Sequence, residues 1–174
     1  MLGLGNSLIS AASLGEDFGV NHSLQFDGSN DEVDFTSSGF QTALNASNGN
    51  FKNSGSVSIW ARFENTSVNG QLWDFAIDTD NRIQLQYKQS TDSLTLTFKG
   101  DASSTTQRLA TYDPGSGLEG DSTFHHIACT WDKSAEELKL YVDGTLRDTG
   151  DLTNIVIDGD FDDTPDGTTG ASGN

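Results

Sequence analysis

The chain has 174 residues, a length typical of one domain that buries a hydrophobic core of its own. It carries 26 acidic residues against nine Lys and Arg, and the net charge of -17 argues against nucleic-acid binding, which needs clustered basic side chains. Its one cysteine excludes an intrachain disulfide framework, and no run approaches the roughly 18 apolar residues of a membrane helix.

Residues 1–20 are rich in Gly and Ser and show no clear hydrophobic period. Glycine disfavours a helix, so we expect an extended N-terminal arm that becomes ordered by contact with something else. No basic residue precedes the short apolar runs of this arm, so it lacks the pattern of a secretory signal. A single domain is expected over residues 21–174.

From residue 23 onward, apolar side chains recur with a period of two, which predicts β-strands. The first such run, residues 23–35, places Leu24 and Phe26 on one face and, beyond a polar turn, Val33 and Phe35. The further alternating runs are residues 56–63, 82–88, 93–99, 125–132, 137–144 and 152–160.

Short polar connections predict two hairpins, one joining residues 82–88 to 93–99 and the other joining 125–132 to 137–144. No stretch sustains a helical period. Many short strands without intervening helices predict an all-β fold, a two-sheet antiparallel sandwich or jelly roll. The remaining polar segments, residues 36–55 and 100–122, are expected to be loops at the rim.

The stretch HHIACTWD, residues 125–132, admits three interpretations: a metal site, a nucleophile with its base, or a strand. A strand sends His125 and His126 to opposite faces, where they cannot jointly bind one metal. Cys129 shares a face with Ile127 and Trp131, so we expect a small buried side chain rather than a reactive thiol. The stretch is therefore predicted to be a core strand.

Four motifs in order, SLQFDGSNDEVDF, SVSIWARF, HHIACTWD and LKLYVDGTL, mark a family resemblance. Together they resemble the laminin G-like/pentraxin-like branch of the concanavalin A-like lectin/glucanase superfamily, over about residues 23–174. The resemblance implies a two-sheet antiparallel jelly roll, the fold class that the strand pattern predicts independently.

The end of the sequence departs from this family pattern. In the family a final strand follows the G-A-S-x-N segment and pairs near the first strand, whereas here the sequence stops at TTGASGN. Two alternatives follow: the sequence is truncated, or the missing edge strand is supplied from elsewhere, such as a neighbouring chain.

We expect no catalysis. Glycoside hydrolases of the superfamily carry Glu-x-Asp-x-x-Glu on one strand, and the nearest match here has Glu32 and Asp34 but Ser37 in place of the second glutamate. One carboxylate cannot serve as both nucleophile and general acid. The sequence also lacks G-x-S-x-G, the motif of the nucleophile in many hydrolases.

The acidity has two explanations that stay open: adaptation to a salty medium, or acidic loops that bind Ca²⁺. An EF-hand is excluded, because the acidic run near the C-terminus has Asp163 where that loop needs glycine. Related pentraxin-like folds often bind Ca²⁺ between acidic loops, and the alternative is a solvated acidic turn. The candidate calcium ligands are Asp27, Asn30, Asp31, Asp158, Asp160 and Asp162.

Three side chains are candidate ligand contacts. Trp60 and Arg62 face away from Val57 and Ile59, so an aromatic ring and a cation are expected on the outer or concave face. The alternative is that a long loop covers Trp60. Tyr112, in a polar stretch, is the third candidate.

These features predict a recognition or adhesion module that contacts glycans or partner proteins and that binds neighbouring subunits through its arm and edge strands. Nucleic-acid and membrane-inserted partners are not expected. The fold is usually displayed outside cells, and a virus particle reconciles this with the lack of a secretory signal, so the expected location is a virion surface, as in a phage decoration or tail-fibre protein, or extracellular. The rivals are a purely structural virion or assembly component and, third, a glycan hydrolase.

Overall fold

The computed structural model describes residues 23–26, 31–34, 38–45, 51–63, 69–100, 107–115, 117–118 and 123–157. The chain divides into two units, residues 1–32 and residues 33–174. All the helices and strands of the described residues belong to the second unit, whose fold follows.

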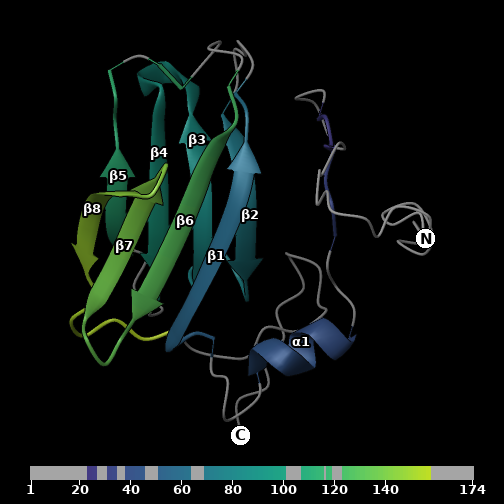
Figure 1. Cartoon of the computed structure of the whole chain (residues 1–174). Coiled ribbons are helices and arrows are strands. Elements are labelled where there is room, and N and C mark those ends of the chain that lie inside the picture. Colours follow the sequence, from purple (N-terminus) through teal and green to yellow (C-terminus); the bar gives the residue numbers. More distant parts are fainter. Residues whose placement is uncertain are drawn as a thin grey trace, which may run out of the picture. The chain divides into compact units, whose positions relative to one another are not determined.

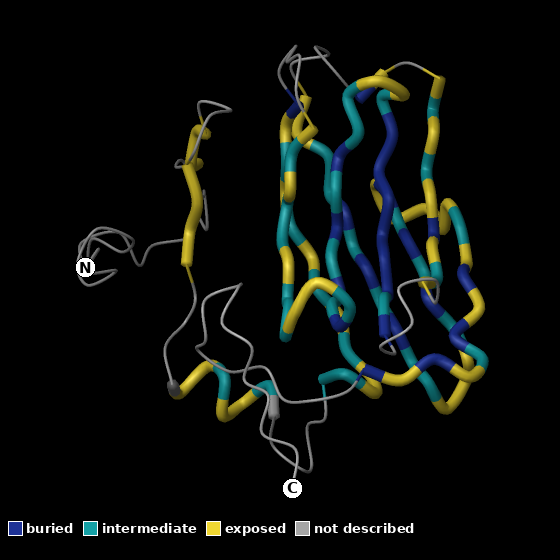
Figure 2. The backbone as a smooth tube through the Cα atoms, turned by 180° about the vertical axis from the view of Figure 1, so that it is seen from behind, coloured by how far each residue is buried: buried dark blue, intermediate teal, exposed yellow. Residues whose placement is uncertain are grey.

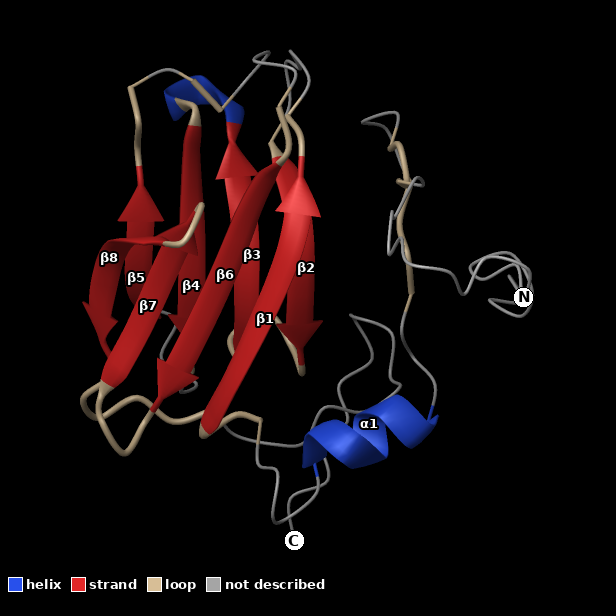
Figure 3. Cartoon of the chain, viewed as in Figure 1, coloured by secondary structure: helices blue, strands red, loops and turns tan. Residues whose placement is uncertain are grey.

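Eight strands form two four-stranded antiparallel sheets (Figures 1 and 3). The first sheet has the order β1 (Ser54–Ala61), β6 (His125–Asp132), β7 (Glu137–Val142) and β8 (Thr145–Asp151). The second has the order β2 (Gly70–Ala76), β3 (Arg82–Lys88), β4 (Ser93–Lys99) and β5 (Gln107–Tyr112). A short 3₁₀ helix, η1 (Gln89–Thr91), joins β3 to β4. The predicted all-β antiparallel sandwich is confirmed.

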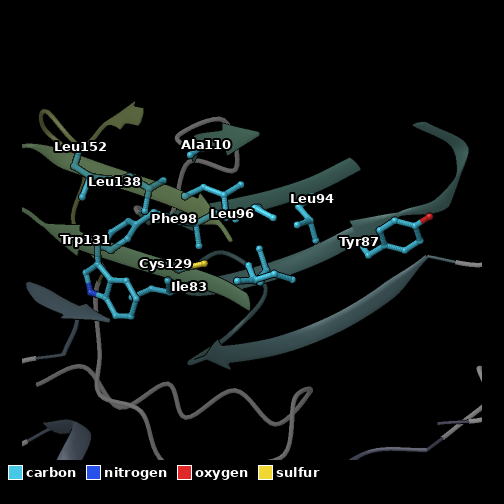
Figure 4. Packing of buried hydrophobic residues seen from close by; sticks show 14 of the residues in the cluster. Ile83, Tyr87, Leu94, Leu96, Phe98, Ala110, Cys129, Trp131, Leu138 and Leu152 are labelled. Atoms are coloured by element: carbon cyan, nitrogen blue, oxygen red, sulfur yellow. The ribbon is translucent and has the colours of Figure 1, made fainter. Parts of the chain in front are cut away.

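The core lies between the two sheets and is built from the alternation of the central strands (Figures 2 and 4). On β6, Ile127, Cys129 and Trp131 point inward and are buried. The neighbouring inward positions are equally buried: Ile83, Leu85, Leu94, Leu96, Phe98, Leu138, Leu140 and Val142. Burial of each large apolar side chain contributes about 1.5–3 kcal/mol, so this layer is the main favourable term of the fold.

One side of the sandwich is closed by contact between β5 and β8. The Asp148 carboxylate accepts a hydrogen bond from the Thr111 backbone N–H at 2.7 Å. A Cβ atom at Gly150 would lie 2.6 Å from the Leu109 carbonyl oxygen, so glycine is what lets the two backbones approach. The end strands β5 and β8 thus cover one another.

The opposite side, formed by β1 and β2, is less completely covered. The inward residues of β1, Val57 and Ile59, are only half-buried, although their partners on β6 are buried. On β2, Trp73 and Phe75 are likewise half-buried and pack against the core.

Both segments expected to be rim loops contain regular structure. Within 36–55 lies α1 (Ser38–Asn45), whose Phe40 ring lies 6.2 Å from the ring of Phe75 and whose Leu44 packs against the core. Eight residues give one apolar pair four positions apart, too little to show a sustained helical period.

Within 100–122 lies β5, whose hydrophobic pattern is inverted. Leu109 points outward, while Arg108 and Ala110 stand opposite the core residues Phe98 and Leu96 of β4. The sequence of β5 therefore lacks the usual alternation of apolar inward and polar outward residues that identifies a strand.

Two runs expected to be strands are not strands. Residues 23–26 and 31–34 have no regular secondary structure, and Leu24, Phe26 and Val33 are exposed; Phe35 lies outside the described residues. A period of two indicates which face of a sheet each side chain would lie on. A strand forms only if another strand pairs with it, and the alternation does not show whether such a strand exists.

The described part of the run at 152–160 also lacks a strand. Leu152, Ile155 and Ile157 are nevertheless buried. The Leu152 N–H donates to the Glu136 carbonyl and the Ile155 N–H to the Leu152 carbonyl, so this segment covers the core as a turn.

The turn between β7 and β8 is fastened to β6 through one carboxylate. Asp143 and Gly144 have φ values of 52° and 73°, as a two-residue hairpin turn requires. Asp143 Oδ2 lies 2.8 Å from His125 Nδ1, and its Oδ1 accepts a hydrogen bond from the His126 N–H. The hydrogen bond with His125, followed by that from the His126 N–H, holds the pKa of Asp143 below its ordinary value.

Replacing Gly55 by alanine should destabilise the domain, because the added Cβ would lie 2.5 Å from Cζ2 of the buried Trp131 ring. We expect a loss of about 1–3 kcal/mol in the free energy of unfolding, measured by urea titration. Gly70→Ala is the matched control on β2, since nothing lies within 4 Å of its Cβ position. Equal effects of the two variants would contradict the packing described.

Asp143→Asn should lower stability near neutral pH and matter less in acid. Because the folded pKa of Asp143 is depressed, its contribution is present above the ordinary value of 3.8 and is lost as pH falls through the folded pKa. Urea titrations of both proteins from about pH 7 to about pH 2 measure the difference. A difference that stays constant or grows with acidity would refute the role assigned to this carboxylate.

Candidate recognition face

An exposed tryptophan marks the outer face of the first sheet. Because Ile59 and Ala61 of β1 point inward, Trp60 between them points outward, and the residue is 68% exposed. On β6, the residue directly opposite Trp60 is His126, and the two ring centroids lie 5.1 Å apart with an interplanar angle of 43°.

A second pair extends this surface beyond the end of β1. The guanidinium carbon of Arg62 lies 5.5 Å from the centroid of the Phe124 ring, within reach of a cation–π interaction. Phe124 is 44% exposed, and Arg62 is exposed as well. We call Trp60, Arg62, Phe124 and His126 together the Trp60 face.

The Trp60 face combines apolar ring surface with polar groups. An indole offers a flat apolar surface and one N–H donor, an imidazole offers a donor and an acceptor, and a guanidinium offers five N–H donors. This combination suits a ligand with an apolar face and a rim of hydroxyl or carboxylate groups. It does not supply a nucleophile with a base.

The structure brings two of the three predicted contact residues together. Trp60 and Arg62 lie on the Trp60 face, while Tyr112 ends β5, the strand that closes the opposite side of the sandwich against β8. The guanidinium of Arg147 lies 4.6 Å from the Tyr112 ring centroid. The expectation that Tyr112 belongs to a loop is wrong, and a role for any of the three in binding stays a prediction.

Sequence reasoning missed the other two members of the face. The alternation of residues 125–132 places His126 on one side of a strand but does not identify the neighbouring strand, and Phe124 lies just before this run. A signal was available: Phe124 and His126 are two residues apart, so once the antiparallel neighbour of β6 is known they share the side of Trp60 and Arg62.

The two histidines are divided as expected. His125 binds Asp143 on one side of β6, and His126 lies against Trp60 on the other. Cys129 is buried, and this burial raises the pKa of its thiol to about 12. A thiol with this pKa is not a thiolate near neutral pH, which makes Cys129 a packing residue.

Of the predicted calcium ligands, only Asp31 falls within the described residues, where it is exposed. Asp27, Asn30, Asp158, Asp160 and Asp162 lie outside them. Among the residues that the structure describes, no three His, Cys, Asp or Glu side chains gather closely enough to hold a metal ion. None of the helices in the described part of the chain has the length and hydropathy needed to cross a membrane.

The geometry agrees with a comparison to known protein families. The family model Laminin_G_3, of the concanavalin A-like lectin/glucanases superfamily, matches residues 27–172. Comparisons with curated proteins and with solved structures gave no match. Laminin G-like domains are commonly binding modules and are generally non-catalytic. With two antiparallel four-stranded sheets and a family match over most of its length, the chain belongs to the laminin G-like family of the concanavalin A-like superfamily.

Proposed function

We propose that this protein is a non-catalytic recognition module that binds a glycan through the Trp60 face. The observation that carries the proposal is the exposure of Trp60, which is 68% exposed to solvent on the outer face of the first sheet. Tryptophan is among the residues most strongly enriched where proteins anchor their partners. A sugar ring that stacks on the indole would cover this surface.

The surroundings of Trp60 support a sugar rather than a flat apolar partner. His126 lies on one side of the indole, and the Arg62 and Phe124 pair continues the face beyond the end of the strand. Ring surface and hydrogen-bond donors are therefore interleaved. Hydroxyl groups at the rim of a sugar need such donors and acceptors once water is displaced.

The same geometry supports a non-catalytic role. The Cys129 thiol is buried with a raised pKa, and the four side chains of the Trp60 face include no carboxylate, hydroxyl or thiol that could act as a nucleophile. We propose that the module is displayed outside cells, as is usual for the fold, or on a virion surface, and calcium dependence is part of the proposal.

Trp60→Ala should weaken glycan binding by about 30-fold, the effect of removing one well-placed aromatic anchor. Glycan-array screening of the full chain, followed by calorimetry on the best ligand, measures the loss. Trp60→Phe should retain most of the affinity because it keeps an aromatic surface. Leu146→Ala is the matched control, since Leu146 is an exposed apolar side chain on β8 of the same sheet.

Two results would count against this proposal. Unchanged glycan binding by Trp60→Ala would show that another surface of the protein binds the sugar. Absence of binding to any glycan, with and without added calcium, would favour a purely structural role. Loss of binding in EDTA, restored by Ca²⁺, is the result expected if the acidic loops hold a metal.

A further inference from the structure

The end strands of the two sheets differ in how their edges are protected. Natural sheets guard their edges with charged side chains, bulges or covering segments, because an unguarded edge pairs with another strand. Here β5 and β8 cover each other, as the Asp148 to Thr111 hydrogen bond shows. Among the strands in the described part of the chain, the remaining end strands are β1 and β2.

Strand β2 carries two of these protections. Its pairing with β3 shifts register between Gln71 and Trp73, which marks a bulge or irregularity, and it bears a charged residue, Asp74, which pairs with Arg82. A bulge twists a strand away from a regular partner.

Strand β1 has neither protection. Its sequence, SGSVSIWA, contains no charged residue and no proline, and its eight positions pair with β6 without a shift of register. Each of the other seven strands contains at least one Asp, Glu, Lys or Arg. In a protein with a net charge of -17, β1 is the uncharged exception.

The inward face of β1 is also incompletely buried. Val57 and Ile59 are half-buried, while Cys129 and Ile127, directly opposite on β6, are buried. A strand added beside β1 with apolar residues at alternate positions would cover these two side chains.

The lack of charge favours a second copy of this chain as the occupant. When a strand pairs with its own copy in antiparallel fashion, each charged side chain meets the same set of charges on the partner, and like charges directly opposite are destabilising. The outward residues of β1 that would meet across the axis are small or neutral: Ser54, Ser56, Ser58 and Trp60.

We propose that two copies of this protein associate through β1, antiparallel about a two-fold axis at Ser58, and join their first sheets into one eight-stranded sheet. This register places Val57 beside Ile59 of the second copy and Trp60 beside the small Ser56. A register centred on Val57 instead would set Arg62 opposite Lys52 of the second copy, two like charges. The axis at Ser58 avoids this repulsion.

A charged residue introduced at position 58 tests the pairing, because the exposed side chain of Ser58 would lie opposite Ser58 of the second copy. By sedimentation velocity of the full chain from about 1 to about 200 µM, the wild type should approach twice its mass of 18.6 kDa. Ser58→Asp and Ser58→Lys should each raise the dissociation constant of the dimer by at least about tenfold, since like charges then oppose. Mixing the two variants should restore the dimer.

Thr149→Asp and Thr149→Lys are matched controls, at an exposed position on β8 at the other end of the same sheet. They should leave the dimer unchanged. A wild type that stays monomeric, or folded Ser58 variants that dimerise as the wild type does, would overturn the proposal.

Hydrogen exchange on the wild type provides a test that requires no variant. Backbone amides of residues 55–61 should exchange more slowly as the protein concentration rises through the dimer range, because half of them would gain a partner strand. Exchange that is the same at all concentrations would overturn the proposal.

Discussion

The contact between the inward side chains of the two sheets determines the rest of this structure. Ile127, Cys129 and Trp131 on β6 meet the apolar side chains of β3 and β4, and this buried layer fixes which way every neighbouring residue points. Because successive side chains of a strand alternate, each residue placed inside sends its neighbours outside. The outer surface is thus a consequence of how the core is packed.

The Trp60 face is the clearest example of this consequence. Antiparallel pairing between β1 and β6 sets Ile59 opposite Ile127 in the core and Trp60 opposite His126 outside. A shift of β1 by one residue in this register would turn Trp60 inward and Val57 and Ile59 outward, so that both apolar side chains would lose their contact with the core. The packing of the core therefore determines on which side of the sheet Trp60 and His126 lie.

Much of the sandwich could be predicted from the sequence, because β1, β3, β4, β6 and β7 alternate cleanly. The failures have physical causes. In β5 the large apolar residue, Leu109, points outward and Ala110 inward, and in α1 the helix is too short to show its period. Residues 23–34 have the right alternation but form no strand in the described segments, since pairing depends on a partner far along the chain. Two of the four residues of the Trp60 face could be predicted, because the alternation of β1 alone shows that Trp60 and Arg62 share a side. Phe124 and His126 could not be added to them, because the sequence does not show that β6 is the neighbour of β1.

The alternation of side chains holds Trp131 inside the sandwich and Trp60 on its surface, where a ligand can reach it. Hydroxyl-radical footprinting with mass spectrometry measures the oxidation rate of each tryptophan in the folded protein. We expect rapid oxidation of Trp60 and protection of Trp131, with the rate at Trp60 falling when a bound glycan is present. Protection of Trp60 in the free protein, or oxidation of Trp131 at a comparable rate, would contradict it.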